Sequence, residues 1–175
     1  VCVNIPPSTT LRYTTDGTAP TLTNGKTSST GLFTVKSTTC YRFRLFRNGA
    51  LPSPVVTRTY IYKDKTYPFP IISVVTDDRN LNSTEYGVFK EGPNGRSGRG
   101  SENDCNWNMS WDRPVSFEYI TTDNECVISQ ECDLSMCGGW SRSWSPHSFK
   151  LKASKTYDFQ NFFAAQLFDK KPYIK

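Results

Sequence analysis

The chain has 175 residues, 36% hydrophobic and 14% aromatic, and its formal net charge is +5. This size suits one or two domains. No apolar run approaches the roughly 20 residues that cross a bilayer, so we expect no membrane span. The 21 lysines and arginines are scattered rather than gathered in one block. Scattered basic residues are typical of a solvated surface, so we expect no nucleic-acid partner.

The first third of the chain predicts short β-strands. Turn signals at Asp16-Gly17, Gly25-Lys26 and Asn48-Gly49 separate them. The expected strands cover residues 11–15, 32–36, 40–47 and 55–62. Short strands at close spacing, rich in threonine and tyrosine, predict a small β-sandwich of immunoglobulin-like type over residues 1–62.

A polar, proline-bearing stretch at residues 63–70 is the expected linker to a second part, residues 71–175. The β-branched run 71–76 predicts a strand buried on both faces. The pattern predicts further strands at 115–121, 126–130 and 148–153, a helical turn at 78–81 capped by Asp77, and an amphipathic helix at 158–168. The second part is therefore expected to be a mostly antiparallel, β-rich (α+β) lobe.

Residues 92–108 are rich in glycine, serine and asparagine and have almost no apolar side chain before Trp107. This composition predicts a long loop that is mobile, functional or both.

Six cysteines allow fifteen full pairings, and the sequence does not choose among them. There is no Cys-x-x-Cys, and His147 lies outside any Cys/His cluster, so we expect no metal site. Cys2 with Cys40 is the pairing to test in the first domain. Buried thiols are the alternative.

The stretch from Gly138 to Lys152 carries the clearest candidate site. Gly138 and Gly139 let a ligand approach the backbone, while Ser141 and Arg142 offer a hydroxyl and a planar guanidinium. Lys150 then lies on an alternating strand, so the whole could cradle an anion. The alternative is a surface hairpin with solvated lysines. The spacing is not that of a Walker-A loop.

Four tryptophans suggest another kind of site. Indole rings stack on sugars, so an aromatic platform would bind a cell-surface glycan. Two of the four, next to the expected loop, could instead fill the core. The four are Trp107, Trp111, Trp140 and Trp144.

Gly-Gly-Trp-Ser-Arg at 138–142, followed by Ser-Phe-Lys-Leu-Lys at 148–152, resembles the CotH (spore-coat protein H) kinase-like family. Phe-Pro-Ile-Ile-Ser-Val-Val-Thr-Asp at 69–77, Tyr-Gly-Val-Phe at 86–89 and Trp-Asp-Arg-Pro-Val at 111–115 agree in the same order. The resemblance covers residues 69 to the end.

A second resemblance covers residues 4–62. Leu-Arg-Tyr-Thr-Thr-Asp-Gly-Thr-Ala-Pro-Thr at 11–21 is similar to the chitobiase/β-hexosaminidase C-terminal accessory domain. Such modules accompany secreted and cell-envelope enzymes and carry no catalytic residues. The resemblance implies an extracellular or cell-envelope location in a bacterium.

The CotH resemblance implies an atypical protein kinase that transfers phosphoryl from ATP, with Mg or Mn, to a secreted or surface protein. Gly138, Gly139, Ser141 and Arg142 would form the phosphate-side loop, and Lys150 the basic residue of the following strand.

Two departures from the CotH family pattern matter. His147 stands where the family often has lysine, which would weaken a phosphate contact there. The family's base and metal carboxylates would lie beyond Lys175. We therefore expect this chain, as a fragment, to have no catalytic residue, no cofactor and no activity of its own. A structural protein with a degenerate kinase-like domain is a further alternative.

Overall fold

The computed structural model describes residues 1–62, 66–158 and 160–167. The chain is mainly β, with antiparallel sheets, as the sequence predicts. It divides into two compact units: unit 1 is Val1–Val75 with Glu118–Ser129, and unit 2 is Thr76–Phe117 with Gln130–Lys175. The division into 1–62, 63–70 and 71–175 stays a prediction, and residues 63–65 of the expected linker lie outside the described residues.

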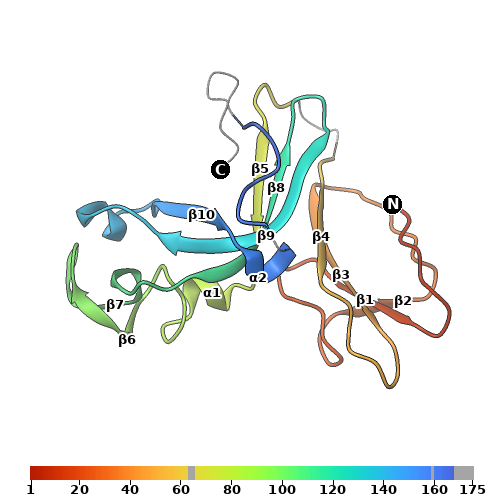
Figure 1. Ribbon diagram of the computed structural model, residues 1–175, viewed down its shortest axis with the longest axis horizontal. Coiled ribbons are helices and arrows are strands. Elements are labelled where there is room, and N and C mark those ends of the chain that lie inside the picture. Colours follow the sequence, from red (N-terminus) through yellow and green to blue (C-terminus); the bar gives the residue numbers. More distant parts are fainter. Residues whose placement is uncertain (63–65, 159, 168–175) are drawn as a thin grey trace. The chain divides into compact units, whose positions relative to one another are not determined.

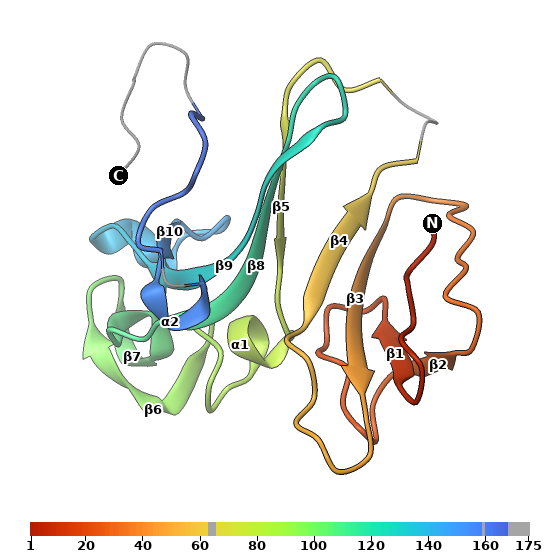
Figure 2. The same ribbon diagram turned by 45° about the vertical axis from the view of Figure 1, so that its right-hand side comes forward.

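Unit 1 begins with a four-stranded antiparallel sheet. Its strands are β1 (Thr10–Thr14), β2 (Lys26–Ser28), β3 (Thr39–Phe46) and β4 (Val56–Tyr60), in the order β2-β1-β3-β4 (Figure 2). Three of the four predicted strands are confirmed. The fourth, at 32–36, is wrong: Leu32 forms only an isolated bridge with Cys2. The segment is bonded instead to the chain start, where Phe33 N donates to Val1 O at 2.9 Å.

The core of this sheet is aromatic. Tyr41 and Phe43, two residues apart on β3, point to the same face and stack with ring centroids 5.5 Å apart. Leu11 is 1% exposed in the same cluster, and Phe33 packs on it from the side. Burying each such side chain contributes about 1.5–3 kcal/mol, so this cluster is the main source of stability for the sheet.

A second sheet has the order β10-β9-β8-β5, from β5 (Ile71–Val75), β8 (Arg113–Ile120), β9 (Cys126–Met136) and β10 (Phe149–Ala153). β10 pairs antiparallel with β9, from Phe149 opposite Met136 to Ala153 opposite Cys132. The prediction that the 71–76 strand is buried on both faces is wrong. β5 is an edge strand, and Ile72 is 61% exposed.

The helices are short. α1 (Arg79–Asn82) confirms the predicted helical turn, and Asp77 Oδ1 accepts from Arg79 N at 3.2 Å. α2 spans Lys155–Asp158. The predicted helix at 158–168 is wrong for residues 160–167; residues 159 and 168 lie outside the described part. The Phe162 carbonyl accepts from the Gln130 side chain rather than from a helical amide. No helix in the described ranges could cross a membrane.

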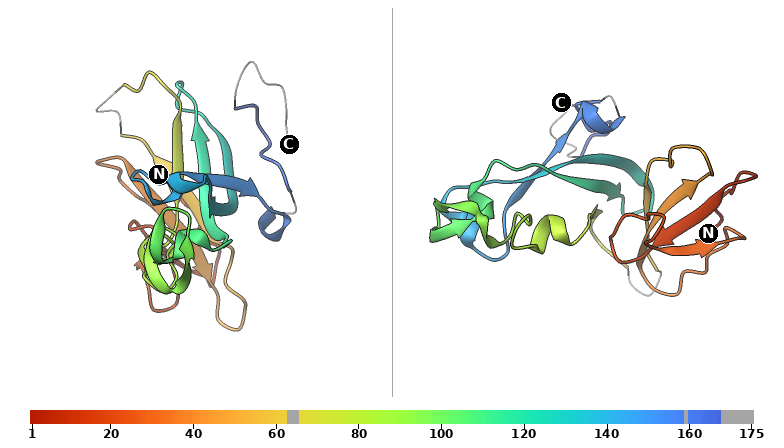
Figure 3. Two further views of the ribbon diagram at one scale, coloured as in Figure 1. Left: turned by 90° about the vertical axis from the view of Figure 1, so that its left-hand side faces the viewer. Right: turned by 90° about the horizontal axis from the view of Figure 1, so that it is seen from below.

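The predicted loop at 92–108 is also wrong. It is an antiparallel hairpin, β6 (Glu91–Gly98) and β7 (Ser101–Cys105), followed by the 3₁₀ turn η1 (Asn106–Asn108). Glycines let its backbone pack closely, because a Cβ on Gly92 would lie 1.6 Å from Thr84 O. Figures 1 and 3 agree in placing the 3₁₀ turn η2 (Trp140–Ser143) beside this hairpin.

Candidate anion-binding site

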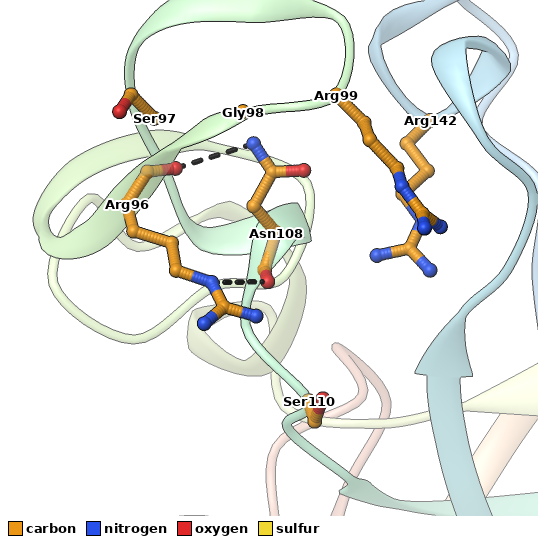
Figure 4. A pocket seen from close by; sticks show the side chains of 7 residues that line it. All are labelled: Arg96, Ser97, Gly98, Arg99, Asn108, Ser110 and Arg142. Atoms are coloured by element: carbon orange, nitrogen blue, oxygen red, sulfur yellow. Dashed lines mark hydrogen bonds between the residues drawn. The ribbon is translucent and has the colours of Figure 1, made fainter.

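A polar pocket of about 460 Å³ lies within unit 2, between the β6–β7 hairpin, η1 and η2. Its lining carries three guanidinium groups and no carboxylate, and Figure 4 shows Arg99 and Arg142 both reaching into it. Positive charge without a neighbouring acid favours an anionic occupant. The lining residues are Arg96, Ser97, Gly98, Arg99, Asn108, Ser110 and Arg142.

The hairpin fixes Arg96 through a reciprocal pair of hydrogen bonds with Asn108. Arg96 Nε donates to the Asn108 carbonyl at 3.1 Å, and Asn108 Nδ2 donates to the Arg96 carbonyl at 3.2 Å (Figure 4). Asn108 is 6% exposed, so these bonds are largely shielded from water. The other guanidinium nitrogens of Arg96 are left to face a ligand.

Arg99 lies at the tip of the hairpin, between two glycines with positive φ. Gly98 has φ 146° and Gly100 has φ 87°, conformations that side-chain-bearing residues rarely adopt. Within the described ranges, neither a hydrogen bond nor an ion pair engages the Arg99 side chain, and its charge is available to a ligand.

Arg142 is held by the glycine turn that the sequence singled out. Its Nε donates to the Gly138 carbonyl at 2.6 Å, and its Nη1 donates to the Trp107 carbonyl at 3.2 Å. Gly138 has φ 93°, and a Cβ there would lie 2.5 Å from Ser141 Oγ. The turn therefore sets the orientation of Arg142, while Gly138, Gly139 and Ser141 themselves do not line the pocket.

The other two predicted phosphate contacts also lie outside the lining. His147 Nδ1 donates to the Arg142 carbonyl at 2.8 Å, and its ring stacks on Phe89 with centroids 4.8 Å apart. It supports the backbone of Arg142 rather than facing the pocket. Lys150 is exposed on β10, opposite Ser135.

The four tryptophans separate into two pairs. Trp107 is 6% exposed, and the Arg113 guanidinium covers half-buried Trp111 at 4.6 Å from the ring centroid. Trp140 and Trp144 are 72% and 67% exposed. An external ligand could therefore stack on Trp140 and Trp144, but not on Trp107 and Trp111.

Sequence reasoning missed Arg96, Arg99 and Asn108. The signal was present in the run Gly-Arg-Ser-Gly-Arg-Gly at 95–100, which alternates glycine with basic residues. It was hidden because a hairpin without apolar side chains has no hydrophobic period to detect.

A buried arginine anchors the segment that precedes the hairpin. Arg113 Nε and Nη2 both donate to the Tyr86 carbonyl, at 3.0 and 2.7 Å, and its guanidinium lies 3.6 Å from the Tyr86 ring centroid. Burial lowers the pKa of this guanidinium below its ordinary value. The backbone contacts make it structural rather than a ligand contact.

The pocket lining does not fit a divalent cation, because it offers no carboxylate and carries three positive charges. In the described part of the chain no group of three or more His, Cys, Asp or Glu side chains could hold a metal ion. Cys2 and Cys40 are both free thiols, so the pairing suggested for them is not formed. Burial raises the pKa of Cys40.

A family model described as "Fn3 associated" matches residues 4–60. The match covers the β1–β4 sheet and supports an immunoglobulin- or fibronectin-type III-like domain there. No curated protein and no solved structure matches the chain.

Proposed function

We propose that unit 2 binds the phosphate groups of a nucleotide, and that the chain is part of an atypical protein kinase of CotH type. The observation that carries the proposal is the convergence of Arg96, Arg99 and Arg142 on one pocket without an acidic side chain. A guanidinium presents its donors in a planar fork that matches phosphate oxygens.

Two elements of the site supply different parts of a phosphate cradle. The glycine-bearing hairpin brings Arg96 and Arg99 from one side, and η2 brings Arg142 from the other. In protein kinases a glycine-rich β-hairpin covers the nucleotide phosphates. The hairpin here has comparable composition, with glycines at positions 92, 95, 98 and 100.

This arrangement binds and orients phosphates but contains no group placed to move a proton or hold a metal. Its lining has neither a carboxylate nor an imidazole that could act as a base, so no step of phosphoryl transfer is assigned to it. The proposed role of the chain is therefore phosphate binding, with an extracellular or cell-surface protein as the acceptor of the phosphoryl group.

Glycan binding is the second candidate. The exposure of Trp140 and Trp144 favours it, because large indole surfaces facing water are suited to stack on sugar rings.

The test is calorimetric titration of the full 175-residue chain with inorganic tripolyphosphate and with ATP, at low and high salt. Arg99→Ala is the main variant, because among the described residues this side chain has no hydrogen-bond or ion-pair partner whose loss would disturb the fold. Arg142→Ala is the second. Losing one charge-assisted contact should weaken binding by roughly 10- to 100-fold.

Lys150→Ala is the matched control, since it removes one positive charge outside the pocket. Binding that weakens in both arginine variants but not in the control supports the proposal. Absence of binding at low salt, or equal affinity in all three variants, would overturn it.

A further inference from the structure

A second, smaller pocket lies within unit 1, where the segment that leads into β5 passes the turn between β8 and β9. Figures 1 and 2 agree in placing these two segments side by side. The pocket has a volume of about 240 Å³ and shares no residue with the arginine pocket of unit 2. Its described lining consists of two aromatic rings, one isoleucine, three threonines and one asparagine, none of them charged.

The aromatic side of this pocket is formed by Tyr67 and Phe69, which are 39% and 76% exposed. Each of them directly precedes a proline, Pro68 and Pro70. A residue before proline is kept out of the helical region, and proline fixes its own φ, so this segment has few backbone conformations. The two rings therefore face water on a restricted backbone, and little conformational entropy is lost when a ligand packs on them.

The polar side is the turn between β8 and β9. Thr121 N donates to the Glu125 carbonyl at 2.8 Å, and Asn124 N donates to the Thr121 carbonyl at 3.0 Å. Asn124 has φ 64°, the left-handed conformation that asparagine tolerates better than most residues. In the described part of the chain, no hydrogen bond engages the side chain of Thr122 or of Asn124. The turn thus satisfies its own backbone and leaves a hydroxyl and an amide free to bond to a ligand.

The chemistry of the lining selects an uncharged ligand that has both an apolar face and hydroxyl groups. The C–H face of a sugar ring packs on aromatic rings, and its hydroxyls exchange hydrogen bonds with amide and hydroxyl side chains. The volume is below the roughly 300–1,000 Å³ that is common for drug-sized ligands, which suits a single ring. A phosphate would find no positive charge among the described lining residues.

We propose that this pocket binds one uncharged pyranose unit of a polysaccharide. Tyr67 and Phe69 stack on the sugar ring, and Thr122 and Asn124 bond to its hydroxyls. The site lies in unit 1 and depends neither on the arginine pocket nor on the exposed tryptophans, which belong to unit 2.

Two variants probe the two sides of the pocket separately. Phe69→Ala removes the more exposed ring. Asn124→Gly removes the amide and keeps the turn, because glycine adopts positive φ without strain. Ile72→Ala is the matched control, since it removes an exposed apolar side chain of β5 that does not line the pocket.

The experiment is a titration of the full chain, followed through its backbone amide resonances by NMR. The probes are glucose, mannose, galactose and N-acetylglucosamine, each as the monosaccharide and as a linear oligosaccharide. At least one should shift the amides of residues 121–124 with a single dissociation constant. Phe69→Ala should weaken that binding roughly 10-fold, and Asn124→Gly roughly 3- to 10-fold, while Ile72→Ala leaves it unchanged.

Three results would overturn the inference. The first is that none of the sugars shifts the amides of the turn. The second is equal affinity in Phe69→Ala, Asn124→Gly and the control. The third is binding that survives Phe69→Ala and is lost in the double variant Trp140→Ala/Trp144→Ala, which would place the sugar in unit 2. Tripolyphosphate binding by the arginine pocket is unaffected by any of these results, so the two proposals fail separately.

Discussion

The β1–β4 sheet of unit 1 and the β6–β7 hairpin of unit 2 are both antiparallel, and they are held by different chemistry. The sheet surrounds an aromatic cluster in which Tyr41, Phe43 and Leu11 are buried. The hairpin has almost no apolar side chain. It is fixed by glycines that let backbones approach and by buried Asn106, whose Nδ2 donates to the Thr84 and Gly87 carbonyls at 2.9 Å each.

This difference assigns the two regions different roles: the sheet supplies stability, and the hairpin presents side chains to a ligand. Apolar burial is non-directional and gives the sheet a robust core. Close backbone packing and directed hydrogen bonds leave the hairpin's arginine side chains pointing away from any core, where an anion can reach them. The following substitutions test this division in order of expected effect.

Phe43→Ala should have the largest effect. Phe43 is 5% exposed within the aromatic cluster, and truncating a buried phenylalanine costs about 3–5 kcal/mol of unfolding free energy. Denaturant unfolding measures the loss. Leu51→Ala, at a position 93% exposed, is the control and should change stability by less than about 0.5 kcal/mol. Equal losses of unfolding free energy in both variants would show that the aromatic cluster is not the main source of the sheet's stability.

Gly92→Ala should have the second-largest effect. The added Cβ would overlap Thr84, and we expect the unfolding free energy to fall by about 1–3 kcal/mol. Because the hairpin carries Arg96 and Arg99, tripolyphosphate affinity should fall with it. Glu102→Ala, an exposed position on β7, is the control. Unchanged affinity in a destabilised Gly92→Ala protein would show that the hairpin does not shape the pocket.

Tyr157 should make the stability of unit 2 depend on alkaline pH. Burial, and then the hydrogen bond donated to Asp133 Oδ1 at 2.7 Å, raise the pKa of this phenol well above its ordinary value. The folded state therefore keeps the proton while the unfolded state loses it above about pH 10. The stabilisation is complete below that pH and is lost as pH rises further.

Tyr157→Phe should cost about 1 kcal/mol at neutral pH, for the lost hydrogen bond. It should also flatten the decline of unfolding free energy between about pH 9 and pH 11, measured by urea titration. A decline as steep as in the unsubstituted chain would show that Tyr157 is not its source.

The smallest effect expected is chemical rather than energetic. Cys105, at the end of β7, is 0% exposed, and burial raises the pKa of its thiol. In the native state it should react with a thiol reagent far more slowly than exposed Cys2. Mass spectrometry of partly labelled protein identifies the sites. Comparable labelling of both would mean that the hairpin base opens readily.

The sequence predicts the parts of the fold that have a hydrophobic period. The alternation of Tyr41, Phe43 and Leu45 places β3 almost to the residue, and the Asp16-Gly17 turn forms with Asp16 Oδ1 accepting from Thr18 N. β6 and β7 could not be predicted this way. Their glycines lack a Cβ and so allow close contact between backbones, and this contact leaves no hydrophobic pattern in the sequence.

The candidate site shows the same limit. The sequence predicts Arg142 as an anion contact because it follows two glycines, and Arg142 does line the pocket. Arg96 and Arg99 join it only through the hairpin, whose contact with η2 depends on the missing Cβ of Gly100 beside Ser143. The sequence pattern predicts a direct phosphate contact at His147, whereas its hydrogen bond goes to the Arg142 backbone.

The central claim is that the arginine pocket receives phosphates, and arginine side-chain NMR tests it most directly. The Nε–Hε resonances of Arg96, Arg99 and Arg142, assigned through single Arg→Lys variants, are followed as tripolyphosphate is added. The account predicts that these three shift together with one dissociation constant while Arg113, bonded to the Tyr86 carbonyl, stays in place. Shifts spread over surface arginines, or none at the three, would contradict it.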